Sequence, residues 1–361
     1  MTDVLLSKDR NNFNLLRLLA ALGVVITHSY SLLGFPEKDF LTKMTNGLLS
    51  FSRLGVYVFF VISGFLVANS LWHSSNIRSF FWKRFLRIFP ALLVLLTLTV
   101  FLVGPIFTTA SIKDYFLHPS NYRYLLGGAI LYDIQYRLLG VFTSNPRQGM
   151  NGSLWTLPYE WTLYVVLACL AIPLRKKRVI KLIGLIFLFI GLRVLVGRYS
   201  VFQTIDLLNL DTRQLLLWGV LFFGGALTLE LRQYLQFRFI VSLSLIILLV
   251  WISFMNKNLA LYFMFFVIPY VTISLSALQL PKRVMEFFSS FDFSYGIYIY
   301  AYLIGQILVY MFGKNLEVWN LAFLTAITSL PFAMISWYFI EKPFLKLKKW
   351  SFKKEPITPA L

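Results

Sequence analysis

The sequence predicts an all-α membrane protein, a polytopic bundle of about ten transmembrane helices with both termini in the cytoplasm. Hydrophobic residues make up 58% of the 361-residue chain, whereas ordinary soluble domains contain about 45–50%. The mean hydropathy is +0.72. Apolar stretches long enough to cross a bilayer, which takes about 20 residues, recur along the whole chain.

Basic loops separate the predicted spans and set their orientation. Lys and Arg collect before the first span, between the second and third, between the fourth and fifth, and after the last. Cytoplasmic loops carry such an excess, and an even number of spans then returns both termini to that side. The ten spans are 13–33, 51–72, 85–106, 155–174, 180–198, 213–230, 237–255, 259–279, 292–312 and 318–340.

Composition also excludes several function classes. The net charge of +19 follows from this topology, so no nucleic-acid partner is expected. The single cysteine, Cys169, can form neither an internal disulfide nor a cysteine metal site, and we expect no metal. The sequence contains no Walker loop, dinucleotide glycine fingerprint or HExxH motif. The long first span, with no small-residue cleavage site after it, predicts no cleavable signal peptide.

The first span carries two polar residues that point to function. Its sequence, NNFNLLRLLAALGVVITHSYSLL, contains Arg17 and, eleven residues later, His28. Eleven residues make about three helical turns, so both lie on one face, about 16 Å apart. A charge inside a span costs about 3 kcal/mol, and histidine is the commonest general base. Alternatively, Arg17 anchors the helix at the interface, and His28 is a core histidine with a satisfied hydrogen bond.

The second and third spans add a small-residue pair and an arginine pair. Ser63 and Gly64 lie mid-span in GVYVFFVISGF, where small residues favour close helix packing; we prefer this interpretation to a serine nucleophile. Arg84 and Arg87 in FFWKRFLRIFP share one helix face. We expect them at the cytoplasmic start of a helix, where free amides and guanidinium groups favour a phosphorylated ligand. Topological anchoring is the alternative.

An outer connection and a buried carboxylate follow. The segment 108–153 is rich in tyrosine, and loops of this length are usually functional or disordered. Its aromatic content favours partly ordered packing. Glu160 lies inside the fourth span, where a carboxylate must be paired or protonated. It could hold a cation, orient the histidine or bind a sugar hydroxyl. The neighbouring Trp155, Tyr159 and Trp161 could stack on a sugar ring, but we prefer to interpret them as an interfacial aromatic belt.

The last two spans end in a basic segment. The ninth span is tyrosine-rich, FSYGIYIYAYLIGQ, and Glu341, Lys342 and Pro343 close the tenth, where Glu341 could pair with Arg84 or Arg87. We divide the chain into a transmembrane domain, 1–345, and a short basic cytoplasmic tail, 346–361.

Taken together, these segments resemble the acyltransferase 3 family of bacterial integral-membrane acyltransferases, over about residues 11–344. The resemblance rests on Arg17 and His28, FFVISGF, Arg84 with Arg87, NGSLWTLPYE ending in Glu160, SYGIYIY and the Glu341-Lys342-Pro343 ending. It implies an O-acetyltransferase of the polysaccharide type. Such enzymes transfer an acyl group, usually acetyl, from cytosolic acyl-CoA to a hydroxyl of a sugar in a surface polysaccharide or its lipid-linked precursor.

Two positions depart from the family pattern. Asn14 stands where members usually have an acidic residue, and Ala301 stands where many have a second histidine. The chain also stops too soon for the soluble esterase-like domain that some members carry.

The resemblance assigns roles to these residues. Acetyl-CoA is the expected acyl donor, with its phosphates on Arg84 and Arg87, and His28 is the expected general base. Arg17 would stabilise the thioester or the surroundings of His28, and Glu160 would orient the acceptor or tune the cavity. Expected partners are acyl-CoA, a glycan or lipid-linked sugar, and membrane lipids, in the bacterial inner membrane; a homo-oligomer is compatible with these features.

Two other function classes stay open. Intramembrane Arg, His and Glu also serve a proton-coupled transporter or flippase of a lipid-linked sugar, although no inverted repeat is evident. The third class is a non-catalytic partner in polysaccharide export.

Overall fold

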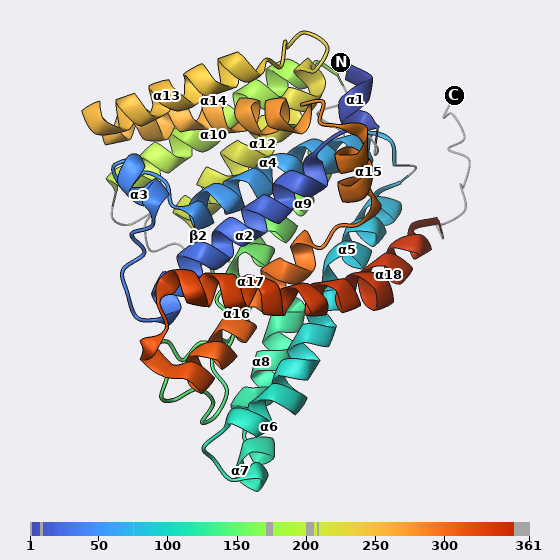
Figure 1. Cartoon of the computed structure of the whole chain (residues 1–361). Helices are drawn as coiled ribbons and strands as arrows, with labels where there is room; N and C mark the ends of the chain where they lie inside the picture. Colours follow the sequence, from blue (N-terminus) through green and yellow to red (C-terminus); the bar gives the residue numbers. More distant parts are fainter. Residues whose placement is uncertain are drawn as a thin grey trace.

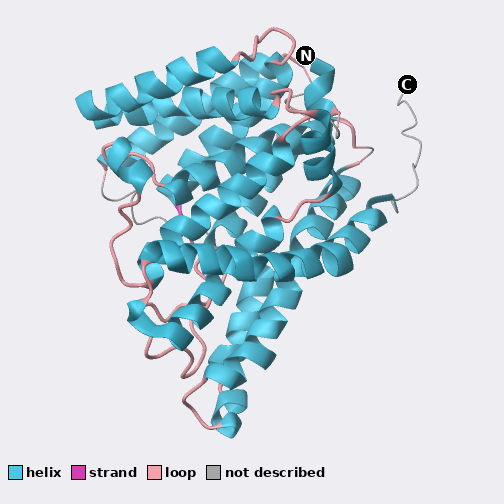
Figure 2. Ribbon diagram, in the orientation of Figure 1, coloured by secondary structure: helices cyan, strands magenta, loops and turns pink. Residues whose placement is uncertain are grey.

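The computed structural model describes residues 2–7, 10–74, 76–170, 176–199, 206–207 and 209–349, and these are almost entirely helical (Figure 2). The fold class is confirmed as a polytopic helical bundle. Eight helical segments within these ranges are long and apolar enough to cross a membrane. Two shorter apolar helices, α9 (Leu157–Cys169) and α13 (Phe239–Met255), coincide with the remaining predicted spans.

The central helices differ from the peripheral ones in burial. In the most apolar 18-residue stretches of α12 and α16, 72% of each stretch is buried, whereas in that of α10 only 17% is buried. α2, α4, α12 and α16 pack on one another in the middle of the bundle, with α14 beside them (Figure 1). The exposed apolar faces of α10, α13 and α17 fit contact with lipid. The long helices not yet bounded are α2 (Phe13–Leu32), α4 (Phe51–Trp72), α10 (Arg178–Arg198), α12 (Thr212–Leu231), α14 (Lys257–Ser276), α16 (Ser294–Phe312) and α17 (Val318–Ile335).

Small residues allow α4 and α12 to approach closely. A Cβ atom added to Gly64 would lie 1.8 Å from the carbonyl oxygen of Phe222, and one added to Gly225 would lie 2.1 Å from that of Val61. A side chain at either position would collide with the facing carbonyl oxygen. Glycine at both positions therefore lets the two helix backbones approach closely, as small residues do between helices in membranes. The predicted packing role of Gly64 is confirmed.

The third span begins earlier than predicted. Asn76 caps α5 (Ile77–Leu98) by accepting a 2.7 Å hydrogen bond from the Ser79 amide. α5 continues through a π-helical turn, η1 (Thr99–Val103), into α6 (Gly104–Phe107). Arg84 and Arg87 therefore lie in the second and third turns. The expectation that they stand at free helix-start amides is wrong, because the segment before Arg84 is already helical and α5 begins at Ile77.

The outer connection is ordered. It folds into α7 (Ile112–Leu117) and α8 (Pro119–Ile130), and α8 packs against α5. The Tyr115 hydroxyl donates a 2.8 Å hydrogen bond to the Val100 carbonyl. In Figure 1, α6 and α7 extend below the bundle, at the opposite end from α1 (Thr2–Leu6).

Short elements complete the described chain. The last predicted span is longer than expected, because α17 runs through a π-helical turn, η5 (Ser336–Glu341), into α18 (Lys342–Lys346). The predicted tail from residue 350 onward lies outside the described residues. The other short elements are α3 (Phe40–Met44), η2 (Leu154–Thr156), β1 (Asp206–Leu207) paired antiparallel with β2 (Leu210–Asp211), α15 (Lys282–Ser290), η4 (Gly313–Asn315) and η6 (Leu347–Lys349).

Candidate active site

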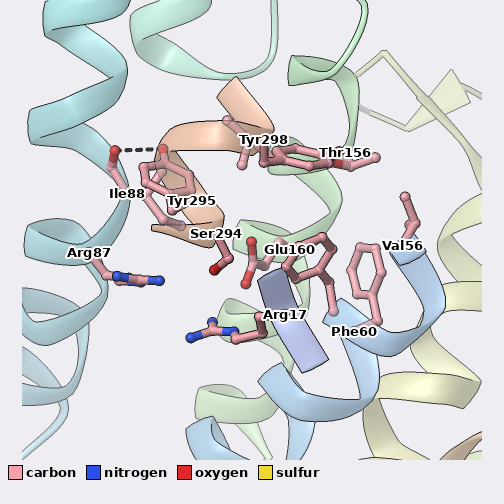
Figure 3. A pocket seen from close by; sticks show the side chains of 12 residues that line it. Arg17, Val56, Phe60, Arg87, Ile88, Thr156, Glu160, Ser294, Tyr295 and Tyr298 are labelled. Carbon is pink, nitrogen blue, oxygen red and sulfur yellow. Dashed lines mark hydrogen bonds between the residues drawn. The ribbon is translucent and has the colours of Figure 1, made fainter. Parts of the chain in front are cut away.

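Three of the predicted site residues line one narrow cavity in the middle of the bundle. Arg17 from α2, Arg87 from α5 and Glu160 from α9 surround a volume of about 50 Å³ (Figure 3). Tyr295 and Tyr298 of α16 line the same space, and the Tyr295 hydroxyl donates a 2.8 Å hydrogen bond to the Ile88 carbonyl. We call this space the central cavity.

A carboxylate absent from the predicted site holds the two arginines together. Asp292 Oδ2 lies 3.0 Å from Arg17 Nη1 and 2.6 Å from Arg87 Nη2. Its other oxygen, Oδ1, accepts hydrogen bonds from the Ser294 hydroxyl and amide. Burial alone would raise the pKa of Asp292, but Arg87 and then Arg17 outweigh it and lower the pKa to about 2. Asp292 is therefore ionised and fixes the guanidinium groups beside the cavity.

Glu341 supplies a second carboxylate to the same network. Its Oε2 lies 3.4 Å from Arg87 Nη1, and its Oε1 accepts a 3.1 Å hydrogen bond from the Ser336 hydroxyl. The predicted pairing of Glu341 is confirmed for Arg87. Both Ser336 and Glu341 belong to the π-helical turn η5, a distortion that is frequent at functional sites.

A larger basic cavity adjoins this network and shares Arg17 and Arg87 with the central cavity. It has a volume of about 610 Å³ and combines six cations with a single carboxylate, Asp292. We call it the Arg84 vestibule. Its cationic side chains belong to Arg17, Arg84, Arg87, Lys342, Lys346 and Lys348.

The vestibule contains donors without protein partners. Within the described part of the chain, the buried Nε atoms of Arg17 and Arg84 and the Nε1 atom of Trp337 have no hydrogen-bond acceptor. Each such donor costs about 1–3 kcal/mol, and an oxygen-rich anion would satisfy it. Burial, followed by Arg84, Arg87 and Arg17, lowers the pKa of Lys348 to about 7. These features favour a phosphorylated ligand.

Glu160 stands between the central cavity and the Arg84 vestibule. Its Oε1 accepts a 2.9 Å hydrogen bond from the Ser63 hydroxyl and another from Tyr164. Glu160 lines the central cavity, while Ser63 and Tyr164 line the vestibule. Ser63 therefore acts as a hydrogen-bond partner of a half-buried carboxylate, a contact that its place in FFVISGF does not reveal.

His28 lies at the other end of the site. It lines an outer cavity of about 630 Å³, which we call the His28 vestibule, and a small slot that it shares with Ala301 and Tyr302. The His28 and Tyr302 rings meet edge to face, with centroids 5.2 Å apart. Among the described residues neither imidazole nitrogen has a hydrogen-bond partner. The alternative of a core histidine with a satisfied hydrogen bond thus has no protein partner among the described residues.

Shared wall residues connect these spaces in sequence. Arg17 and Arg87 line both the Arg84 vestibule and the central cavity, and Val56 lines both the central cavity and the His28 vestibule. Tyr298 joins the central cavity to the slot beside His28. Since Arg17 and His28 are about 16 Å apart along α2, the spaces follow one another along this helix.

The departures from the family pattern also have positions in the structure. The Asn14 side chain donates hydrogen bonds to the carbonyls of Phe288 and Phe291, at 3.0 and 2.8 Å, and so holds the end of α15 next to Asp292. Ala301 faces the His28 slot. His28 is thus the one histidine lining these cavities in the described part of the chain.

Comparison with known proteins identifies similar sequences over nearly the whole chain. The acyltransferase 3 family, described as an acyltransferase domain, matches residues 10–339. An O-acetyl transferase of Shigella phage Sf6 is 30% identical over 342 residues, covering 93% of this chain and 96% of the phage protein. Nodulation protein 10 of Rhizobium leguminosarum bv. viciae is 29% identical over 365 residues, covering 95% of each chain. No solved structure matches the sequence.

Proposed function

Because the chain belongs to the acyltransferase 3 family and is a membrane O-acyltransferase, we propose that it moves an acetyl group from cytosolic acetyl-CoA to a sugar hydroxyl. The acceptor is a cell-surface polysaccharide or its lipid-linked precursor, and the enzyme works in the bacterial inner membrane. The name of the phage relative, O-acetyl transferase, supports the choice of acyl group.

One observation carries this proposal. Two vestibules of about 610 and 630 Å³ lie at opposite ends of a polar cavity, one rich in cations and the other containing His28. Ligand sites typically have volumes of roughly 300–1,000 Å³. Two sites of this size suit a reaction between a cytosolic donor and an acceptor that arrives from the other side of the membrane.

The donor fits the Arg84 vestibule. Arg87 is already paired with Asp292 and Glu341, whereas Arg84 has no carboxylate within 4 Å among the described residues. Arg84 and the neighbouring lysines are therefore the first partners for the phosphates of CoA, since guanidinium groups match phosphate oxygens. Arg87 lies deeper, where it would steer the pantetheine arm and its thioester past Arg17 into the central cavity.

Transfer then requires one base. His28 takes the proton of the acceptor hydroxyl, and the oxygen attacks the carbonyl carbon of the thioester. The new C–O bond forms as the C–S bond breaks, and the CoA thiolate leaves and takes up a proton. A second nucleophile is unnecessary when both reactants are held in position.

The test uses cells and purified protein together. In a deletion strain, wild type should restore O-acetyl signals in the proton NMR spectrum of the surface polysaccharide, and His28→Ala should not, because loss of a general base costs about 10²–10⁴ in rate. His118→Ala is the matched control, since His118 is exposed and caps α8 away from the cavities.

Purified protein separates the enzyme from the transporter alternative. Acetyl-CoA consumption that depends on an added acceptor supports the enzyme, whereas a transporter or a non-catalytic partner consumes none. Full activity of His28→Ala at equal membrane levels would overturn the assignment of the base.

A further inference from the structure

The His28 vestibule carries a charge pattern that the proposed reaction does not require. Three cations, Arg53, Arg193 and Lys257, line it together with one carboxylate, Glu37. Among the described residues, no carboxylate lies within 4 Å of any of the three cations. A vestibule that only exposed a hydroxyl to His28 would have no need for this excess of positive charge.

Main-chain carbonyls orient the two arginines without neutralising them. Arg53 Nη1 donates hydrogen bonds to the carbonyls of Gly47 and Leu48, at 3.1 and 3.4 Å. Arg193 Nη1 donates a 2.6 Å hydrogen bond to the Arg213 carbonyl. The three cations belong to α4, α10 and α14, so they approach the cavity from separate helices. Each keeps its full charge and free donors available to a ligand.

Aromatic side chains form another part of the wall. Trp155 packs against Trp218 with ring centroids 5.0 Å apart, and Tyr57 lies on the same lining. Tyr57 and Trp218 are 6% and 3% exposed, so their positions are fixed by packing. Rigid aromatic faces beside the amide groups of Gln214 and Asn258 suit the apolar faces and hydroxyl groups of a sugar ring.

From these observations we infer that the acceptor is an anionic saccharide, whose sugar ring packs on the aromatic wall and whose negative charge binds Arg53, Arg193 and Lys257. This inference rests on the proposed function, because it names the acceptor of that reaction. The anion is a phosphate or carboxylate close to the acetylated hydroxyl, since His28 lines the same vestibule. A phosphate would come from the linkage of a sugar to its lipid carrier, and a carboxylate from an acidic sugar.

The test compares three probes built on the same short prenyl alcohol: a hexose joined through a phosphodiester, a uronic acid glycoside and a neutral hexose glycoside. Binding of each probe to the full-length protein in lipid nanodiscs is measured by isothermal titration calorimetry. Acetyl transfer from acetyl-CoA to each probe is measured separately. The binding arm therefore does not depend on turnover.

The variants are Arg53→Gln, Lys257→Gln and the charge-conserving Arg53→Lys. The two glutamine variants should weaken binding of the preferred anionic probe by about two- to fivefold, in the range of partly exposed charge contacts, and leave the neutral probe unchanged. Arg53→Lys should retain most of the affinity. Arg198→Gln is the control for loss of one positive charge, because Arg198 is exposed and does not line the His28 vestibule.

The outcomes distinguish the sources and the two proposals. Preference for the phosphodiester probe identifies a lipid-linked sugar, and preference for the uronic acid probe identifies an acidic sugar. Equal binding of all three probes, or an equal effect of Arg53→Gln on all of them, overturns the inference. Charge-selective binding without acetyl transfer to any probe would instead contradict the proposed function.

Discussion

Replacing Asp292 with asparagine should destabilise the protein through Arg17, which loses the carboxylate that pairs with it. Asp292 Oδ2 is shared by Arg17 and Arg87, at 3.0 and 2.6 Å, and Arg87 retains Glu341 in the variant. Arg17 has no other carboxylate within 4 Å among the described residues. The side chains of Arg17, Arg87 and Asp292 are 18%, 15% and 8% exposed.

The expected magnitude follows from this geometry. Breaking a buried ion pair by removing one partner costs about 3–5 kcal/mol. Since the arginines are slightly exposed and one of them keeps a partner, we expect about 2–3 kcal/mol for Asp292→Asn. Arg17→Gln in the Asp292→Asn background should cost much less than in wild type, with a coupling energy of about 1 kcal/mol or more.

The assay is a double-mutant cycle on the free energy of unfolding. Purified variants are unfolded with SDS in mixed micelles, and tryptophan fluorescence reports the transition. The control cycle removes the exposed pair of Arg123 and Asp133, 66% and 32% exposed, where the coupling should lie between about 0 and 1 kcal/mol. If the Arg17–Asp292 coupling is no larger than about 0.5 kcal/mol, Asp292 does not hold Arg17 and the argument fails.

Three further predictions test the donor site, the bundle packing and the carboxylate between the cavities. The pKa of Lys348 in the free site is lowered to about 7, and binding of a phosphate group should favour the protonated lysine. The Kd for CoA should therefore rise by up to about tenfold per pH unit above pH 7. Calorimetry should find a flatter pH profile for Lys348→Met; an unchanged profile would contradict this role. Gly64→Ala should strongly lower the melting temperature, because its Cβ would collide with the Phe222 carbonyl, whereas Gly184→Ala, with open space around it, should be neutral or stabilising by up to about 1 kcal/mol. Glu160→Gln should lower kcat about tenfold or more, because a neutral amide oxygen accepts the Ser63 and Tyr164 hydrogen bonds more weakly than a carboxylate oxygen does. It should leave CoA affinity unchanged, since Glu160 does not line the Arg84 vestibule; a change confined to affinity would refute this role.

Periodicity and hydropathy were sufficient to predict the spans and one side of the site. The eleven-residue spacing of Arg17 and His28 is a property of a single helix, and it correctly predicts polar groups at successive depths along α2. The boundaries were less accurate where a polar segment continues a helix. α5 starts at Ile77, eight residues before the predicted span, because hydropathy marks the lipid-facing part of a helix and not its hydrogen-bonded ends.

Side-chain contacts between residues far apart in the sequence could not be predicted from the sequence pattern. Asp292 meets Arg17 across 275 residues, and Ser63 meets Glu160 across 97. Which helices bring such pairs together depends on packing of the whole bundle. A usable signal for Asp292 was the scarcity of acidic residues, since the chain has only 15 and this one is the first residue of a predicted span. The cations of the His28 vestibule gave no comparable signal, because they come from three separate helices.

The arginine pair at the junction of the two vestibules has a consequence for the ion permeability of the membrane. A membrane protein with vestibules that open from both ends toward one cavity could conduct protons and metal ions through that cavity. Here Arg17 and Arg87, paired with Asp292 and Glu341, line the narrow central cavity of about 50 Å³, and an arginine at a constriction is one of the groups that exclude cations from a pore. Under the proposed function, the neutral acetyl group of the donor on its flexible arm would meet no such barrier. The same two guanidinium groups can therefore admit a substrate and preserve the proton gradient that the membrane maintains.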